Sequence, residues 1–276
     1  MRGIFYFTCY YKNIMTWAGQ RQLMYLSVVL LFVFGGLFLL IYPRLNVPPT
    51  CTDGKQNGVE TGVDCGGMCA KFCQGDKKPI TVLWARTFEI IPGVYHAVAY
   101  LENQNTDAGV AQVPYKFRVY DADNKLIITR EGTTFISPNG HIAVFEESLP
   151  IGLNRIPKFT RFEFTQDPVF YKTPASFDDI KLVQTAKSLT DLDSMPKASV
   201  TLKNDSFVDT PQFPVIAIVY DATDNAIAVS KTFADAMPKN TDETLYFSWP
   251  HPFDRAADHV EVVPIINAFT VGTTGL

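Results

Sequence analysis

The first pattern along the chain is an apolar run, Met24–Tyr42, in which 19 consecutive residues carry no charge. A helix rises 1.5 Å per residue, so a run of this length spans about 28 Å, the thickness of a bilayer's hydrocarbon core. Trp17, Tyr25 and Tyr42 lie where aromatic residues favour the membrane interfaces. The pattern predicts one transmembrane helix over residues 24–42, in contact with the lipid bilayer.

The same run also resembles the apolar core of a secretory signal, and two features favour an uncleaved anchor. The run is longer than a usual signal core, and no small-residue cleavage site follows it, because residues 43–49 are rich in proline. Three basic residues and no acidic residue precede it. Residues 1–23 are therefore expected to be cytoplasmic, with the later domains outside the cell membrane. The charge bias is weaker if translation begins at Met15.

Beyond residue 79 the pattern changes to short segments in which apolar and polar positions alternate. Tyr115, Phe117 and Val119 alternate with Lys116 and Arg118, the period of a half-buried strand. Turn residues separate these segments at intervals of about 8–12 residues, as in immunoglobulin-like sandwiches. In the first 100-residue unit, strands are expected near residues 80–90, 95–103, 113–120, 125–130, 141–147 and 159–165.

The pattern then repeats at a period near 100 residues. The clearest match sets Pro114–Asn124 beside Pro214–Asn225, and each copy contains a Tyr-Asp pair before a turn. We therefore expect an all-β ectodomain of two tandem immunoglobulin-like β-sandwiches, over residues 79–178 and 179–276, behind a Cys-rich stalk over residues 43–78. The other matched blocks are Ile80–Leu83 with Ile180–Val183, Tyr100–Asn103 with Thr201–Asn204, Thr134–Phe135 with Thr232–Phe233, and Phe162–Phe164 with Val260–Val262.

One strand of the second unit departs from the alternation. Residues 213–219 are apolar at nearly every position, whereas a sandwich strand needs only one apolar face. Ile216 and Ile218 on the second face therefore form a candidate binding surface. Long side chains of a neighbouring strand, the first domain or another protein would cover it, and we favour packing within the chain.

The aspartates of the two Tyr-Asp pairs, Asp121 and Asp221, invite a catalytic interpretation. Both end an expected strand in the same turn context. A carboxylate at such a position usually accepts hydrogen bonds from the backbone N–H groups of the turn. We therefore expect turn caps rather than catalytic groups.

Four of the five cysteines, Cys51, Cys65, Cys69 and Cys73, fall within 23 residues. A segment this short buries too little apolar surface to fold alone, so two disulfides are expected, with three possible pairings. The C-x3-C-x3-C spacing and the lack of a nearby histidine disfavour zinc. Cys9 lies apart on the expected inner side and is predicted to be a free thiol.

The same segment contains four hard oxygen donors, Asp53, Asn57, Glu60 and Asp64, among glycines. Such donors suit calcium, but their spacing does not match an EF-hand loop. Turn chemistry, in which these side chains bond the local backbone, is the favoured alternative.

Charge and histidine content limit the function classes. Of the 24 basic and 28 acidic residues, four basic and no acidic ones lie in the first 50 positions, so the remainder is acidic and poorly suited to nucleic acid. The four histidines show no metalloprotease spacing, and no nucleophile elbow or phosphate loop occurs. His251, Asp254, Asp258 and His259 form the one conceivable acid–base or metal group, and a solvated loop is the favoured interpretation.

Two motifs resemble known families. The pattern C-x-D-G-x-x-N-G-x-E-x-x-x-D-C-G-G-x-C resembles a short Cys-rich segment of secreted and surface proteins of many microbes, which implies an extracellular, disulfide-stapled segment. The cores ending at Asp121 and Asp221 resemble FxLYD-type domains, extracytoplasmic β-sandwich modules of bacteria and archaea, over roughly residues 90–165 and 195–264. Val119 and Val219 replace the leucine of that motif. This resemblance implies a fold and a location but no reaction.

Together these features predict a single-pass, membrane-anchored, non-enzymatic interaction or spacer module of the cell envelope. Its expected partner is an unidentified envelope or surface protein, and no cofactor is expected. An accessory subunit of a larger membrane complex is the alternative. An envelope hydrolase and a metal-binding protein are disfavoured.

Overall fold

The computed structural model describes residues 17–45 and 51–270, and side chains at 42–45 lie outside that description. Cys9 therefore lies outside the described residues. The chain forms two compact units, Met1–Asp53 and Gly54–Leu276.

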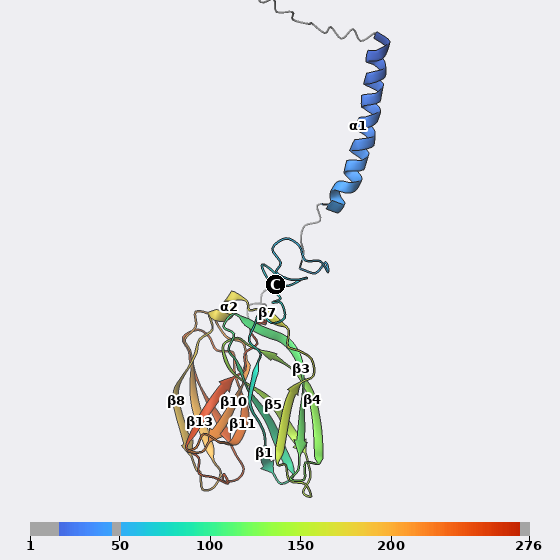
Figure 1. Cartoon of the computed structure of the whole chain (residues 1–276). Coiled ribbons are helices and arrows are strands. Elements are labelled where there is room, and N and C mark those ends of the chain that lie inside the picture. Colours follow the sequence, from blue (N-terminus) through green and yellow to red (C-terminus); the bar gives the residue numbers. More distant parts are fainter. Residues whose placement is uncertain (1–16, 46–50, 271–276) are drawn as a thin grey trace, which may run out of the picture. The chain divides into compact units, whose positions relative to one another are not determined.

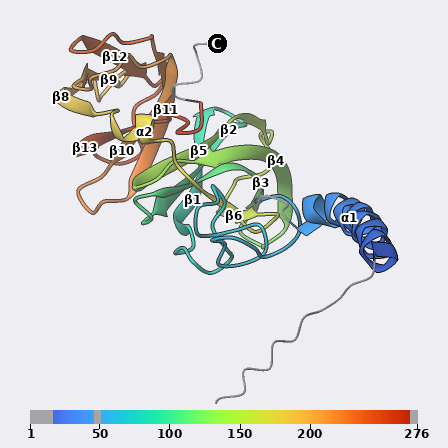
Figure 2. The ribbon, with the colours of Figure 1, turned by 90° about the horizontal axis from the view of Figure 1, so that it is seen from above.

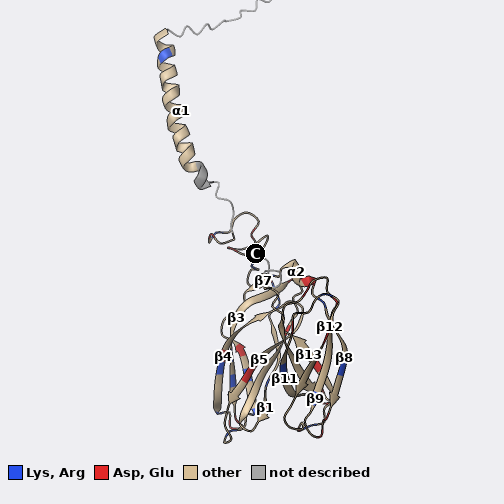
Figure 3. Ribbon diagram, turned by 180° about the vertical axis from the view of Figure 1, so that it is seen from behind, with Lys and Arg blue, Asp and Glu red and all other residues tan. Residues whose placement is uncertain are grey.

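The described part of the first unit contains one helix, α1 (Trp17–Leu45), which includes the whole apolar run. Residues Trp17–Ile41 are long and apolar enough to cross a membrane, and none of this stretch is buried within the protein. Figure 3 shows α1 without charged residues along most of its described length. The predicted helix is confirmed. Its length and composition suit a membrane anchor and equally a signal sequence.

The first sandwich is made of two antiparallel sheets, β1-β2-β5 and β4-β3-β6, with β7 paired to the start of β3. The six expected strands are present, with ends shifted by a few residues. Their bounds are β1 (Thr81–Ile91), β2 (Val94–Asn103), β3 (Ala108–Tyr120), β4 (Leu126–Ile136), β5 (Gly140–Pro150), β6 (Phe159–Phe164) and β7 (Phe170–Lys172).

The second sandwich repeats this order, with sheets β12-β9-β8 and β11-β10-β13. The all-β class and the two tandem sandwiches are confirmed, and the immunoglobulin-like classification stays a prediction. The elements are α2 (Ala175–Asp178), β8 (Leu182–Thr190), β9 (Lys197–Asn204), β10 (Phe213–Tyr220), β11 (Ala226–Ala234), β12 (Asp242–Ser248) and β13 (His259–Pro264).

Each sandwich has its own core, built by the strand period of two. On β3, Phe117 and Val119 are buried between the two sheets, whereas Lys116 and Arg118 point outward with partial exposure. The second core takes the equivalent positions of β10, including Ala217. Alternation along these strands therefore placed the core correctly from the sequence.

Strand pairing matches β3, β4 and β6 with β10, β11 and β13 at a shift of 100 residues. Phe117 pairs with Phe162 in the first sandwich, and Ala217 pairs with Val262 in the second. Phe162–Phe164 is therefore equivalent to Val262–Pro264, and the predicted match with Val260–Val262 is wrong by two residues. The two blocks look alike because both alternate apolar residues around a glutamate, a pattern that recurs at every second position. Strand pairing also shows that Thr134 is equivalent to Ala234, and not to Thr232 as the sequence match predicted.

The Cys-rich segment is joined to the first sandwich by backbone hydrogen bonds. The N–H of Phe72 donates to the carbonyl of Phe170 (2.9 Å), and the N–H of Lys172 donates to the carbonyl of Ala70 (2.7 Å). The ammonium of Lys172 also bonds the carbonyl of Gly67 (2.7 Å). The segment after Gly54 is therefore an extension of the first sandwich rather than a separate stalk.

The boundary between the sandwiches lies before α2. Phe177 packs against the second core, although the predicted boundary assigned residues up to 178 to the first domain. The short β7 instead belongs to the first sandwich through its pairing with β3. Figure 1 shows α2 and β7 near each other at one end of the sandwiches.

The disulfide Cys65–Cys73 closes a short loop, with a sequence separation of 8. Closing a loop of this length removes entropy worth about 2.5 kcal/mol from the unfolded chain. We expect Cys65→Ser/Cys73→Ser to speed hydrogen exchange of the amides of residues 61–73, while the amides of β2 and β3 keep their protection. Equal loosening of β2 and β3 would show that the sandwich depends on this disulfide.

Candidate functional site

Besides the two cores, the structure contains an apolar contact between the sandwiches. A third cluster joins the outer face of sheet β1-β2-β5 to the outer face of sheet β11-β10-β13. Four sheets therefore stack face to face, and Figure 2 shows them as successive layers. The buried members are Phe88, Val98, Tyr100, Ala143, Ile216, Ile218, Tyr220, Ala226, Val229 and Val263.

Ile216 and Ile218 are both buried in this cluster. Packing within the chain, the interpretation that the sequence favoured, covers the second face of their strand. The candidate binding surface at these residues is therefore wrong as an exposed surface, because the first sandwich occupies it.

A polar network crosses the same interface. The hydroxyl of Tyr100 donates to Glu261 Oε1 (2.5 Å), and that of Tyr220 donates to Glu261 Oε2 (3.0 Å). Burial, followed by the bonds and the charge of Glu261, raises the pKa of Tyr100 and Tyr220 well above the usual range for tyrosine. Both phenols therefore stay protonated donors at physiological pH. Lys231 also pairs with Glu147 across the interface.

The equivalent outer faces of the two sandwiches differ in polarity. Lys116 and Arg118 on the first sandwich form ion pairs with Glu131 and Glu163, both at 2.8 Å, whereas the equivalent positions on the second sandwich are Ile216 and Ile218. This sheet face is thus charged on the first sandwich, where it meets solvent, and apolar on the second sandwich, where the first sandwich covers it.

The outer faces of the other two sheets, β1-β2-β5 and β12-β9-β8, differ in the opposite sense: the first is apolar and the second is polar. Val98 and Tyr100 of β2 are buried in the interface, and the equivalent Ser199 and Thr201 of β9 lie on the outer face of the second sandwich. There Ser199 bonds Ser188 (2.8 Å) and Thr201 bonds Thr244 (2.9 Å). Both outermost faces of the stack are therefore polar, as in the end repeats of arrays.

Asp121 and Asp221 cap their turns. Asp121 Oδ1 accepts the N–H groups of Asp123 (3.0 Å) and Lys125 (2.8 Å). Asp221 Oδ1 does the same for residues 223 and 225, both at 3.0 Å, and Arg255 adds a contact at 3.1 Å to Oδ2. The expected turn-cap role is confirmed by these bonds.

Asp221 supports a prediction on pH. The Thr223 hydroxyl, then the N–H of Asn225, hold the pKa of Asp221 far below its ordinary value of 3.8. Because the folded pKa is lowered, the carboxylate stabilises the fold above about pH 4, and this contribution is lost as the pH falls toward the folded pKa. We expect the melting temperature of Asp221→Asn to depend less steeply on pH below pH 4 than that of the wild type. An equally steep dependence in both proteins would contradict this.

The four clustered cysteines are all in disulfides, so the expected disulfides are present. Such cysteines offer no thiolate to zinc. Asp64 accepts the N–H of Gly54 with both oxygens (2.9 and 3.1 Å), and Glu60 Oε2 accepts the N–H of Asn57 (3.2 Å). These bonds fit the turn chemistry that the sequence also allowed. Asp53 belongs to the other unit, and calcium stays the untested alternative to the favoured turn chemistry.

The conceivable acid–base group is not assembled among the described residues. His251 and Asp254 line one surface depression, whereas Asp258 and His259 line another. His259 stacks on Tyr220 with ring centroids 5.1 Å apart, and its Nδ1 lies 3.0 Å from Asp258. The structure thus brings Asp258 and His259 together but leaves His251 and Asp254 in a separate depression.

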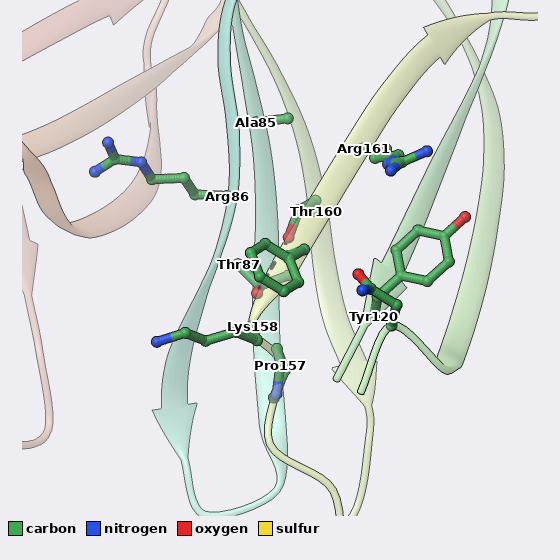
Figure 4. Close-up of a pocket in the computed structure, with 10 residues that line it drawn as sticks. Ala85, Arg86, Thr87, Tyr120, Pro157, Lys158, Thr160 and Arg161 are labelled. Carbon is green, nitrogen blue, oxygen red and sulfur yellow. Dashed lines mark hydrogen bonds between the residues drawn. The ribbon is translucent and has the colours of Figure 1, made fainter. Parts of the chain in front are cut away.

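A site that the sequence did not indicate lies between β1 and β6, with a volume of about 790 Å³. Three basic residues line it, Arg86, Lys158 and Arg161, and its lining contains no acidic residue. Figure 4 shows these side chains with Thr87 and Thr160, whose hydroxyls lie 3.4 Å apart and join the two strands. No single sequence motif signals the site, because its cations lie on segments about 70 residues apart.

The comparisons with known proteins assign no family. No family model matches the chain, and no curated protein matches it. Among solved structures, Bacteroides uniformis β-glucuronidase 2 is 12% identical over 60% of this chain and 22% of that chain, with a TM-score of 0.19. A β-glucuronidase of glycoside hydrolase family 2 is 8% identical over 75% of this chain and 25% of that chain, with a TM-score of 0.21. The chain spans about a quarter of these enzymes, and TM-scores this low carry no argument about function.

Proposed function

We propose that the chain is a membrane-anchored, extracytoplasmic binding module that holds two β-sandwiches as one rigid arm and works by interaction rather than catalysis. The apolar helix and the disulfides fit such a module. The resemblance to FxLYD-type domains and the predicted orientation, with the N-terminus cytoplasmic, belong to the same proposal.

The observation that carries the proposal is the buried contact between the sandwiches. Domains that move independently usually share a small, polar contact. Here Ile216, Ile218 and Val98 are each at most 1% exposed, and the Tyr100–Glu261 bond crosses the same surface. Separation would expose all of these groups, so the two sandwiches are held at a fixed angle.

A distance measurement tests the rigid arm. Spin labels at Glu131→Cys on β4 and Tyr246→Cys on β12 measure the distance across the whole stack in the full chain. The change Cys9→Ser removes the thiol that is predicted to be free. We expect one narrow distance distribution. A broad distribution would show independent domains and remove the main support for a spacer.

Location and partner need a separate test in native membranes. We expect the full chain to resist carbonate extraction, and protease added outside the cell to cleave the sandwiches. Cross-links to one defined envelope protein would support the binding role. Extraction by carbonate, or a turnover of envelope substrate that one point mutation abolishes, would contradict the proposal.

A further inference from the structure

We propose that the pocket between β1 and β6 of the first sandwich, the β1–β6 site, binds an extended acidic segment of a partner polypeptide. This inference rests on the proposed binding function and names the chemistry of the partner.

The charge of the site points to an anionic ligand. Arg86, Lys158 and Arg161 line it without an acidic neighbour in the lining, although acidic residues outnumber basic ones in the chain as a whole. None of the three forms an ion pair within the described part of the chain, whereas Lys116 and Arg118 of the adjacent β3 both do. Three cations without a carboxylate partner produce a positive field that attracts acidic groups.

The arrangement of the cations favours an extended ligand over a single small anion. Figure 4 shows Arg86 and Lys158 reaching to one side of the β1–β6 pair and Arg161 lying beside Tyr120 on the other side. The Arg161 guanidinium lies 5.5 Å from the Tyr120 ring centroid, and Arg86 donates to the carbonyl of Ala226 (3.0 Å). The three groups do not converge on one point. A single small anion therefore cannot contact all three.

The strands themselves offer a backbone edge. Within the described residues, β6 pairs with β3 and with no second strand, and β1 pairs with β2 alone. The edges of both sheets thus meet at the site, joined by the Thr87–Thr160 contact rather than by a ladder. An unpaired edge accepts an extended peptide through main-chain hydrogen bonds.

An apolar side chain at the rim favours a polypeptide over a simple polyanion. Phe159 at the start of β6 lines the site and is 47% exposed. Leu153 and Ile156, on the loop that leads into β6, are 77% and 76% exposed. A phosphate polymer or a sulfated glycan gains little from such groups. A peptide whose acidic and apolar residues alternate meets the cations and this rim together.

The second sandwich supplies an internal comparison. A depression also lies between β8 and β13, the equivalents of β1 and β6. Its charged lining residues are Lys187 and Asp258, a mixed pair instead of three cations. The proposed specificity therefore belongs to the first sandwich and not to the fold that both share.

The test uses the full chain in detergent micelles and a fluorescent peptide of about ten residues with alternating Glu and Val. We expect saturable binding by fluorescence anisotropy, weakened roughly tenfold by Lys158→Gln/Arg161→Gln, because both side chains are exposed and neither is needed for the core. The control Lys187→Gln/Lys239→Gln removes the same charge elsewhere and should change the affinity less than about twofold. Alternate N-methylation of the peptide should abolish binding, since it removes main-chain donors.

Several results would overturn the proposal: no binding of the peptide, equal weakening by both double variants, or undiminished binding of the N-methylated peptide. Stronger, Lys158- and Arg161-dependent binding of polyphosphate or of vesicles with anionic lipid would also overturn it, in favour of a general anion site. In each case the proposal of a rigid binding module would still stand if the spin-label distance distribution were narrow and the membrane cross-links were specific. A broad distance with retained peptide binding would instead overturn the rigid arm alone.

Discussion

Ile218→Lys is expected to separate the two sandwiches while each keeps its own fold. Ile218 is fully buried against the first sandwich, so the change loses an aliphatic contact worth about 1.5–3 kcal/mol and places a charge in an apolar contact, at a cost of several kcal/mol more. The protein avoids this second cost by opening the interface. We therefore expect calorimetry to show two transitions instead of one, and the spin-label distance across the stack to broaden.

The repeat supplies a matched control at the equivalent position. Arg118 lies on the outer face of the first sandwich, partly exposed and paired with Glu163. We expect Arg118→Ile to change the free energy of unfolding by less than about 1 kcal/mol, because exposed ion pairs contribute little. If Ile218→Lys melted in one transition at the wild-type temperature, the interface would contribute no stability and the rigid-arm proposal would fail.

Asn204→Ala is expected to lower the stability of the second sandwich by about 2–4 kcal/mol, because it leaves buried backbone groups without partners. Asn204 is fully buried, and its amide donates to the carbonyls of Val208 (3.0 Å) and Met237 (2.9 Å), while its oxygen accepts the N–H of Ser206 (3.1 Å). Chemical denaturation with tryptophan fluorescence measures the loss, since Trp249 lies in the second core.

The first sandwich contains the equivalent hydrogen bonds at Asn103. Its amide donates to the carbonyls of Ala108 and Ser137, both at 2.9 Å. Asn103→Ala should therefore destabilise the first sandwich by a similar amount, and Asn154→Ala, on an exposed loop, should have no measurable effect. A loss below about 0.5 kcal/mol at Asn204 would show that the chain relaxes around the missing amide. The triplet Asn204-Asp205-Ser206 also fits a glycosylation sequon, and burial of Asn204 excludes modification of the folded domain.

Local chemistry was predictable wherever neighbours along the chain decide it. The apolar run predicted α1, alternation at residues 115–119 predicted the buried face of β3, and the turn context of Asp121 and Asp221 predicted their caps. Each of these depends on contacts within a few residues, for which sequence spacing fixes the geometry. The match of the sixth strand failed by two residues because alternation fits several registers equally well, and pairing with β3 and β10 selects one.

The sequence by itself determined an apolar N-terminal helix, a disulfide-bonded segment and a doubled all-β fold with no catalytic motif. Tertiary structure decided what covers Ile216 and Ile218, and which cations share the β1–β6 site. An apolar second face shows only that something covers it. The residues that cover this face depend on how two folded sandwiches dock, which joins positions far apart in the sequence, such as Tyr100 and Glu261. Arg86 and Arg161 likewise line one site only because two sheet edges lie beside each other, so no local pattern contains that site.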